Sequence, residues 1–379
     1  MEEKYIAAMV LAGVGDAMGY KNGSWEFCFD GEEIHKEVKS LGGVKKLVIS
    51  KPNFIVSDDT VLLLSTAEAL IKKAKTENLE EIYSEIAFHY KRDFVADMCN
   101  RSGGLTTASS CYALRPSAPN GWQIPFNPRG GGCGAAMRTM CIGLRYPNIF
   151  NVACLEKLIA VSVESGRMTH NHPTGFLGSF ATALFGAMAI QKLPLLRWGF
   201  VLMSLLPKVL TYVKKEGRDV EENEKAWSYF QEQWQKYLTL RNLLDGKSKP
   251  VFPNNYGVKD RDAFYKSLAY QCRWGGASGH DAPMIAYDAL LYANDQWMTL
   301  CKHGMLHSGD NDSTGVIAGF CYGAMYGFKD VPDCNYKRVE YSERLTNAGR
   351  MLYQIASTNG YLVKSTDGCE LPVEKLFLQ

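Results

Sequence analysis

Residues 5–18 read Tyr-Ile-Ala-Ala-Met-Val-Leu-Ala-Gly-Val-Gly-Asp-Ala-Met, a run in which apolar side chains recur with helical spacing. Ile6, Met9, Val10 and Ala17 follow the i, i+3, i+4 pattern of one helix face. Alanine and glycine fill much of the rest, so a neighbouring helix can approach closely. The stretch therefore predicts a buried helix near the start of the chain.

The same periodicity recurs along most of the sequence, whereas strand-like alternation hardly appears. No Pro/Gly/Ser-rich linker divides the chain, and the tail after Ser357 has no periodic pattern. We therefore expect an all-α fold in a single compact domain, with the polar, aromatic segment 214–255 as an outer layer. Further helices are expected at roughly 59–74, 79–92, 134–145, 154–165, 174–191, 196–214, 221–244, 261–271, 282–293, 295–303, 313–327 and 339–357.

Composition limits the classes of partner. The 379 residues include 42 Lys and Arg against 40 Asp and Glu, so no bulk charge favours nucleic acid or anionic lipid. The acidic start, Met1-Glu2-Glu3-Lys4, does not resemble a signal peptide, and no apolar run reaches the roughly 18 residues of a membrane span. Eleven cysteines without CxxC pairs indicate reduced thiols. We expect a cytoplasmic monomer that acts on a small molecule or a modified protein.

Two acidic clusters suggest a metal site. Residues 57–60 read Ser-Asp-Asp-Thr and residues 310–314 read Asp-Asn-Asp-Ser-Thr, and each cluster opens into an apolar helical segment. Helix capping explains one oxygen at each helix start. The two turns offer four carboxylates, which would repel one another unless cations lay between them. The pattern predicts an oxygen-only site for Mg²⁺ or Mn²⁺, with two simple caps as the alternative.

The second cluster is not a calcium-binding EF-hand loop. That loop requires a glutamate at its twelfth position, and counting from Asp310 this position is Cys321. Zinc or iron would call for His or Cys within the cluster. His170 and His172 lie elsewhere without a neighbouring Cys or Glu, which favours a structural role for both.

Two glycine-rich stretches could bind a ligand. Residues 129–137, Arg-Gly-Gly-Gly-Cys-Gly-Ala-Ala-Met, open into a helix, as in a cradle for a phosphate group. The alternative is a tight turn that permits close packing. Residues 274–283, Trp-Gly-Gly-Ala-Ser-Gly-His-Asp-Ala-Pro, form either a second ligand loop or an ordinary loop in which His280 acts as a cap.

Residues 15–19, 57–60, 130–136 and 309–314 taken together resemble the ADP-ribosylhydrolases, most closely the ADP-ribosylarginine hydrolase branch. The resemblance covers residues 1–357 and leaves the tail 358–379 outside. It implies an all-α fold around a binuclear Mg²⁺ centre, with Mn²⁺ as an alternative metal and ADP-ribose in an adjacent cleft.

The resemblance also implies roles for individual residues. Its metal ligands are Ser57, Asp58, Asp59, Asp310, Asp312 and Ser313. The diphosphate and neighbouring ribose would contact Gly131, Gly132, Cys133, Gly134, Ala135 and Met137. The nucleotide side would be lined by Trp274, Gly275, Gly276, Ser278, His280 and Asp281. Trp122 and Tyr270 are available for stacking. Glu26 would place a carboxylate over the site, with a solvated loop charge as the alternative.

The implied reaction is hydrolysis of the N-glycosidic bond between ribose C1″ and an arginine side chain of an ADP-ribosylated protein. Two cations would hold the ribose hydroxyls and lower the pKa of a bridging water. Asp58, Asp59 and Asp312 are candidates for the general base, and Glu26 could assist departure of the guanidine. The products would be ADP-ribose and arginine.

Three other functions stay open at the level of sequence. The first is a non-catalytic ADP-ribose-binding pseudoenzyme, although every expected acid is present. The second is a hydrolase of a serine or O-acetyl linkage, because these relatives share the metal motif. The third is a two-metal phosphodiesterase that cuts the diphosphate and releases AMP.

Overall fold

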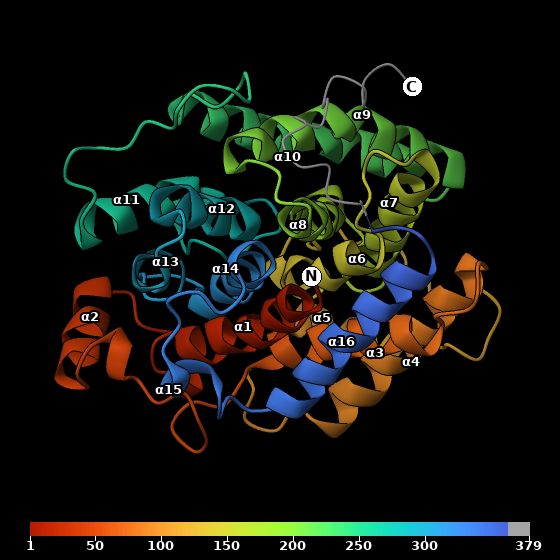
Figure 1. Ribbon diagram of the computed structural model, residues 1–379. Helices are drawn as coiled ribbons and strands as arrows, with labels where there is room; N and C mark the ends of the chain where they lie inside the picture. Colours follow the sequence, from red (N-terminus) through yellow and green to blue (C-terminus); the bar gives the residue numbers. More distant parts are fainter. Residues whose placement is uncertain (363–379) are drawn as a thin grey trace.

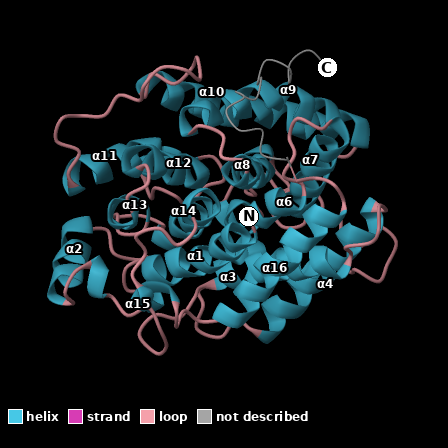
Figure 2. Ribbon diagram, in the orientation of Figure 1, coloured by secondary structure: helices cyan, strands magenta, loops and turns pink. Residues whose placement is uncertain are grey.

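A computed structural model describes residues 1–362, the side chain of Cys272 excepted. This part of the chain is helical throughout and contains no strand (Figure 2), which confirms the all-α prediction. The helices are α1 (Glu2–Tyr20), α2 (Gly31–Ser40), α3 (Asp58–Lys72), α4 (Leu79–Ala96), α5 (Leu105–Ala113), α6 (Met140–Arg145), α7 (Val152–Arg167), α8 (Pro173–Ile190), α9 (Trp198–Glu216), α10 (Val220–Leu240), α11 (Val258–Leu268), α12 (Asp281–Ala293), α13 (Trp297–Gly304), α14 (Asn311–Tyr326), α15 (Asp333–Tyr336) and α16 (Ser342–Thr358). Short 3₁₀-helices occupy Lys21–Gly23, Val44–Lys46, Cys133–Arg138, Leu195–Arg197 and Tyr270–Cys272.

Three helices were not predicted, and one prediction was wrong. Helix α2 buries only Gly31, Ile34 and Val38, and α5 is rich in small polar residues, so neither shows a full apolar stripe. Helix α15 has only four residues. The single helix expected at 134–145 is a 3₁₀-helix followed by α6, because the glycine-rich loop leads into a tight turn.

Helices α1 and α14 pack with their backbones in direct contact. A Cβ atom on Gly15 would lie 2.0 Å from the Gly315 carbonyl oxygen, and one on Gly319 would lie 2.1 Å from the Leu11 carbonyl oxygen. Only glycine fits at such a separation. Because α1 and α14 run side by side here, Asp16 of α1 lies near the start of α14, where the second acidic cluster begins.

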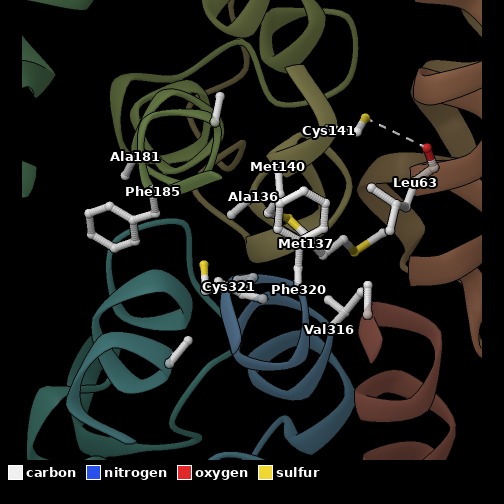
Figure 3. Close-up of a cluster of buried hydrophobic side chains, with 14 of the residues drawn as sticks. Leu63, Ala136, Met137, Met140, Cys141, Ala181, Phe185, Val316, Phe320 and Cys321 are labelled. Carbon is white, nitrogen blue, oxygen red and sulfur yellow. Dashed lines mark hydrogen bonds between the residues drawn. The ribbon is translucent and has the colours of Figure 1, made fainter. Parts of the chain in front are cut away.

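The remaining helices surround this pair (Figure 1). Helix α16 packs on α1, and the fully buried α8 packs on α14. Figure 3 shows apolar side chains from α3, α6, α8 and α14 meeting around the 3₁₀-helix Cys133–Arg138. Helices α9 and α10 form the outermost layer beside α8, which agrees with the outer position expected for segment 214–255.

Two stretches of the described chain are long and apolar enough to cross a membrane by length and composition alone. They are Pro173–Ile190, which is buried along its whole tested length, and Leu195–Glu216, of which 44% is buried. Burial of this kind is usual for the core helices of a globular domain. The expectation that the chain does not span a membrane stays a prediction.

The C-terminal tail is predicted to span residues 358–379. Thr358 ends α16, and the ring of Tyr361 lies 6.0 Å from that of Tyr146. The rest of the predicted tail, residues 363–379, lies outside the described residues.

Replacing Gly319 with alanine tests the contact between α1 and α14. The new Cβ would overlap the Leu11 carbonyl oxygen, so the helices must move apart. We expect the free energy of unfolding to fall by about 2 kcal/mol or more. Urea denaturation measures this change as a lower midpoint. Gly257→Ala is the matched control, because its Cβ would meet no atom within 4 Å. Equal midpoints for the two variants would contradict the proposed contact.

Candidate metal centre

The two acidic clusters lie at the N-termini of α3 and α14. Asp58 and Asp59 form the first turn of α3, whereas Asp310 caps α14 and Asp312 lies in its first turn. All four carboxylates are buried. The helix ends supply partial positive charge, which favours acidic groups here. The capping interpretation is therefore also correct in part: Ser57 Oγ accepts from the Asp59 N–H at 3.1 Å, and Asp310 accepts from the Ser313 N–H at 3.3 Å.

The structure brings Glu26 into the same group. Carboxylate oxygens of Glu26, Asp310 and Asp312 lie within 4.8 Å of one another. The Glu26 side chain lies in the loop after α1, and the residue is only 7% exposed. A solvated loop charge is therefore the wrong interpretation of Glu26. The residue is part of the carboxylate cluster.

Asp16 is a site residue that the sequence analysis did not single out. Its buried carboxylate accepts from the backbone N–H groups of Ser57 at 2.9 Å and Thr60 at 3.0 Å, and from the Thr60 hydroxyl. These bonds fix the start of α3 against α1. An aspartate inside an otherwise apolar helix was the available signal, because a buried charge requires a specific partner.

Burial and mutual repulsion raise the pKa values of these acids. Burial, followed by the charge of Asp312, raises the pKa of Asp16 to about 7, of Asp58 to about 8 and of Glu26 to about 11. Burial also raises the pKa of Asp59 and of Asp312 well above the ordinary carboxyl range. In the absence of a cation, the cluster therefore retains protons at neutral pH.

The donor set fits hard divalent cations. Oε2 of Glu26 and Oδ2 of Asp59 are buried and have no hydrogen-bond partner among the described residues. An unpaired buried acceptor is costly, so each of these oxygens needs a cation, a water or a substrate hydroxyl. Carboxylate and hydroxyl oxygens suit Mg²⁺ or Mn²⁺. The expected ligands Ser57 and Ser313 flank the acids in the same helix starts.

The two glycine-rich loops lie side by side next to this cluster. The Cys133 N–H donates to the Ala277 carbonyl at 3.1 Å, and the Gly279 N–H donates to the Gly131 carbonyl at 2.9 Å. Gly132 and Ser278 form an isolated bridge between these bonds. At the other end, the Asp310 N–H donates to the Gly275 carbonyl at 2.8 Å, and the Cys133 thiol donates to Asp310 Oδ2 at 3.4 Å. The structure thus joins both loops to the acids.

Some residues of these loops have buried side chains that support the loops rather than face a ligand. The side chains of Ala135 and Met137 are buried, so only their backbone can face a ligand. Figure 3 shows Met137 in the core. Asp281 accepts from the Ser278 N–H at 2.8 Å, and burial raises its pKa to about 7. His280 is fully buried and hydrogen-bonds to the Leu268 carbonyl at 3.0 Å. These contacts favour a loop-shaping role for both residues.

Trp122 is not brought to the cluster. Its indole is 3% exposed, donates to Glu80 at 2.8 Å and packs on the ring of Tyr83 at 4.7 Å. Both partners lie in the first two turns of α4, whereas Phe94, near the other end of α4, contacts the loop beside Asp58. Trp122 therefore belongs to the packing of α4. Tyr270, by contrast, is 54% exposed.

His170 lies against the glycine-rich loop, although its spacing from His172 had favoured a purely structural role. Arg138 donates to the Thr169 hydroxyl oxygen at 2.7 Å, and that hydroxyl lies 2.8 Å from His170 Nδ1. The Thr169 hydroxyl can donate to Nδ1, and in that tautomer the ring hydrogen lies on Nε2. Burial and then Arg138 lower the pKa of His170 to about 3, so the ring is neutral. A Cβ atom on Gly132 would lie 3.2 Å from His170 Nε2. Because glycine has no side chain there, the His170 ring lies close to the loop.

A second group of possible ligands is an ion-pair cluster. Ligand atoms of Glu68, His89 and Asp93 lie within 4.8 Å of one another. One guanidinium nitrogen of Arg92 already stands among them, 3.1 Å from His89 Nδ1, 2.9 Å from Asp93 Oδ2 and 3.7 Å from Glu68 Oε2. The side chain thus supplies the cation that these groups require.

Comparison with known proteins agrees with this geometry. The family model described as ADP-ribosylglycohydrolase matches residues 1–361. The chain belongs to this family. The ADP-ribosylhydrolase ARH1 of Dictyostelium discoideum is 41% identical over 362 residues, which cover 90% of this chain and 91% of that protein.

A solved structure shares the fold of this ADP-ribosylglycohydrolase. The structure, titled ADP-ribosylglycohydrolase-related protein complex, superposes with a TM-score of 0.56 at 18% identity, over 94% of this chain and 98% of the other. The predicted family is therefore confirmed across the described domain, and the fold has a solved counterpart. The identity of the metal is a separate question.

Added Mg²⁺ should raise the melting temperature of this protein more at pH 8 than at pH 6. The raised pKa values of Asp16 and Asp58, about 7 and about 8, mean that protons occupy the metal-free cluster at pH 6 and must be displaced by a cation. The metal-free native state then binds more protons than the unfolded chain, so its stability falls as the pH rises from about 4 to about 8. Thermal denaturation with and without MgCl₂ measures both effects. An equal or smaller Mg²⁺-induced rise at pH 8 would contradict this linkage.

Asp16→Asn should weaken Mg²⁺ binding by about tenfold to a hundredfold. An amide oxygen can replace only one of the two carboxylate oxygens that hold Ser57 and Thr60, so the start of α3 loses its fixed position. Isothermal titration calorimetry measures the affinity. Asp93→Asn is the control, because that buried acid belongs to the ion-pair cluster and should leave Mg²⁺ affinity unchanged. Equal affinities for the two variants would exclude a positioning role for Asp16.

Proposed function

We propose that this protein hydrolyses the N-glycosidic bond between ADP-ribose and arginine side chains of mono-ADP-ribosylated proteins. The observation that supports the proposal is the cluster of buried carboxylates beside two joined glycine-rich loops, in a chain of the ADP-ribosylglycohydrolase family. The relative from Dictyostelium discoideum, which carries the name ADP-ribosylhydrolase, supports the same reaction class. The products are ADP-ribose and unmodified arginine.

The proposed metal ligands come from the starts of α3 and α14. They are Ser57, Asp58, Asp59, Asp310, Asp312 and Ser313, with Glu26 beside them. Two Mg²⁺ ions held there, or Mn²⁺ in their place, would supply positive charge for the hydroxyls of the substrate ribose and would acidify a water.

The charge of the site favours arginine as the leaving group. Six buried carboxyl groups interact electrostatically with one another. They are Asp16, Glu26, Asp58, Asp59, Asp310 and Asp312. With a proton on Glu26, the other five still carry more negative charge than two divalent cations neutralise. A guanidinium is cationic, whereas a serine or O-acetyl linkage is neutral. The surplus negative charge therefore stabilises the modified arginine side chain more than the other two linkages.

Two carboxyl groups are suited to the proton transfers. Asp59 Oδ2 is buried without a partner and can accept a proton from the attacking water. In the metal-free cluster, burial and then the charge of Asp312 raise the pKa of Glu26 to about 11, which makes this side chain the candidate proton donor. As water bonds to C1″, the electron pair of the C1″–N bond passes to the guanidine nitrogen, which takes the Glu26 proton. Asp58 and Asp312 are the other candidates for the base.

The glycine-rich loops would position the other end of the substrate. Gly131–Gly134 would bind the diphosphate through backbone N–H groups, assisted by the Nε2–H of the neutral His170 ring. Gly275, Gly276 and Ser278 would line the nucleotide side. Trp274, which the resemblance also places there, lies at the edge of the loop with its ring against Phe27 and Phe29. Such fixed contacts orient C1″ against the carboxylates. A cytoplasmic location, a monomeric state and modified proteins as partners complete the proposal.

Asp59→Asn should lower kcat on an arginine-ADP-ribosylated protein by about a hundredfold or more, because it removes the proposed base. The assay separates ADP-ribose, AMP and unreacted substrate by chromatography in the presence of Mg²⁺, Mn²⁺ or EDTA. Asp330→Asn is the control, because Asp330 is an exposed acid of the same type.

Four outcomes would contradict the proposal. Binding of ADP-ribose without any hydrolysis would indicate a pseudoenzyme, and AMP as the product would indicate a phosphodiesterase. Release of ADP-ribose from serine-linked or O-acetyl substrates, with none from the arginine-linked substrate, would show that the enzyme hydrolyses another ADP-ribosyl linkage. Full activity in the presence of EDTA would show that the reaction needs no metal.

A further inference from the structure

Four apolar side chains close to the carboxylate cluster reach the surface. We name them the apolar rim: Phe27, Phe29, Leu105 and Trp274. Phe27 is 48% exposed, Phe29 72% and Leu105 89%, and Trp274 is half-buried. Large apolar side chains exposed next to a functional site commonly mark the place where a partner binds.

Two parts of the rim are fixed to the site through the backbone. Glu26, a member of the cluster, immediately precedes Phe27, and Trp274 immediately precedes Gly275, whose carbonyl accepts the Asp310 N–H. The rings of Phe27 and Phe29 lie 5.8 and 6.3 Å from that of Trp274. The three rings therefore form one aromatic surface at the edge of the metal centre.

Leu105 is held beside the same cluster by a separate loop. A Cβ on Gly103, two residues earlier, would lie 3.7 Å from Asp58 Oδ2. The Tyr20 hydroxyl donates to the Asn100 carbonyl at 2.9 Å and lies 3.0 Å from the Ser102 hydroxyl, so the loop is anchored to α1. An anchored loop thus presents Leu105 to solvent at the first position of α5.

The charges beside the rim indicate what it binds. Asp30, Glu32 and Glu33, at the start of α2, are exposed directly after Phe29. Lys259, which pairs with Glu32 at 3.0 Å, and Arg273, exposed directly before Trp274, supply two positive charges, so this edge keeps a net negative charge. Exposed carboxylates disfavour the anionic diphosphate of the nucleotide and favour a chain that carries arginine or lysine. A polypeptide segment with apolar and basic residues can pack its apolar side chains on the rings and pair its basic side chains with the carboxylates.

We propose that the apolar rim binds the polypeptide that surrounds the modified arginine, so that the enzyme recognises protein as well as the ADP-ribosyl group. This inference rests on the proposed function. Burial of exposed aromatic and leucine side chains contributes binding energy that a free modified amino acid cannot obtain. The rim therefore distinguishes a protein substrate from ADP-ribosylarginine.

The test compares kcat/KM for an arginine-ADP-ribosylated protein with that for free ADP-ribosylarginine. Phe29→Ser and Leu105→Ser should each lower the value for the protein substrate by about tenfold, through KM. Turnover of ADP-ribosylarginine should stay unchanged, which also shows that the variants are folded. Leu244→Ser is the control, since Leu244 is 46% exposed in the loop after α10; it should change neither value.

The outcomes separate this inference from the proposed function. An unchanged ratio of the two kcat/KM values in both rim variants overturns the inference alone. An equal loss on both substrates, with weaker ADP-ribose binding, assigns the rim to the nucleotide and also overturns it. Failure of the unmodified enzyme to hydrolyse either substrate overturns the proposed function, and the inference with it.

Discussion

The glycine-mediated contact between α1 and α14 is the constraint on which the metal centre depends. Gly15 and Gly319 let the two backbones meet without intervening side chains. This close approach holds Asp16 near the start of α14, while the hydrogen bonds of Asp16 hold the start of α3. One packing interaction therefore sets the relative position of two helix N-termini that are about 250 residues apart in the chain. Any wider spacing would separate the acids of the candidate metal centre.

The acids are held together against their own repulsion. Helix N-termini and buried N–H donors offset part of that cost, but burial still raises the pKa values of Asp58 and Asp59. The buried carboxylates therefore need protons or cations to neutralise their charge. The repulsion among these carboxylates also supports the proposed chemistry. A site with surplus negative charge, and with unpaired oxygens on Glu26 and Asp59, favours cations and a cationic leaving group.

Residue type and spacing predicted much of this arrangement. Apolar periodicity located most helices, and oxygen-rich turns located the metal-ligating candidates, because both signals are local. The prediction failed where the signal depends on distant partners. Helix α2 gains its position from only a few buried residues. Trp122, a candidate for stacking on the substrate, packs on α4. A structural role was expected for His170, yet its ring lies against the glycine-rich loop and beside the Thr169 hydroxyl.

The sequence by itself determined the all-α class, the family and the acids at the starts of α3 and α14, because helical periodicity and short motifs are encoded by neighbouring residues. The tertiary structure decided that Glu26 is buried in the cluster, that Asp16 positions the start of α3, and that the side chain of Met137 belongs to the core. The physical reason is that burial and pKa are set by what packs around a group, and most of those neighbours are contributed by remote parts of the chain.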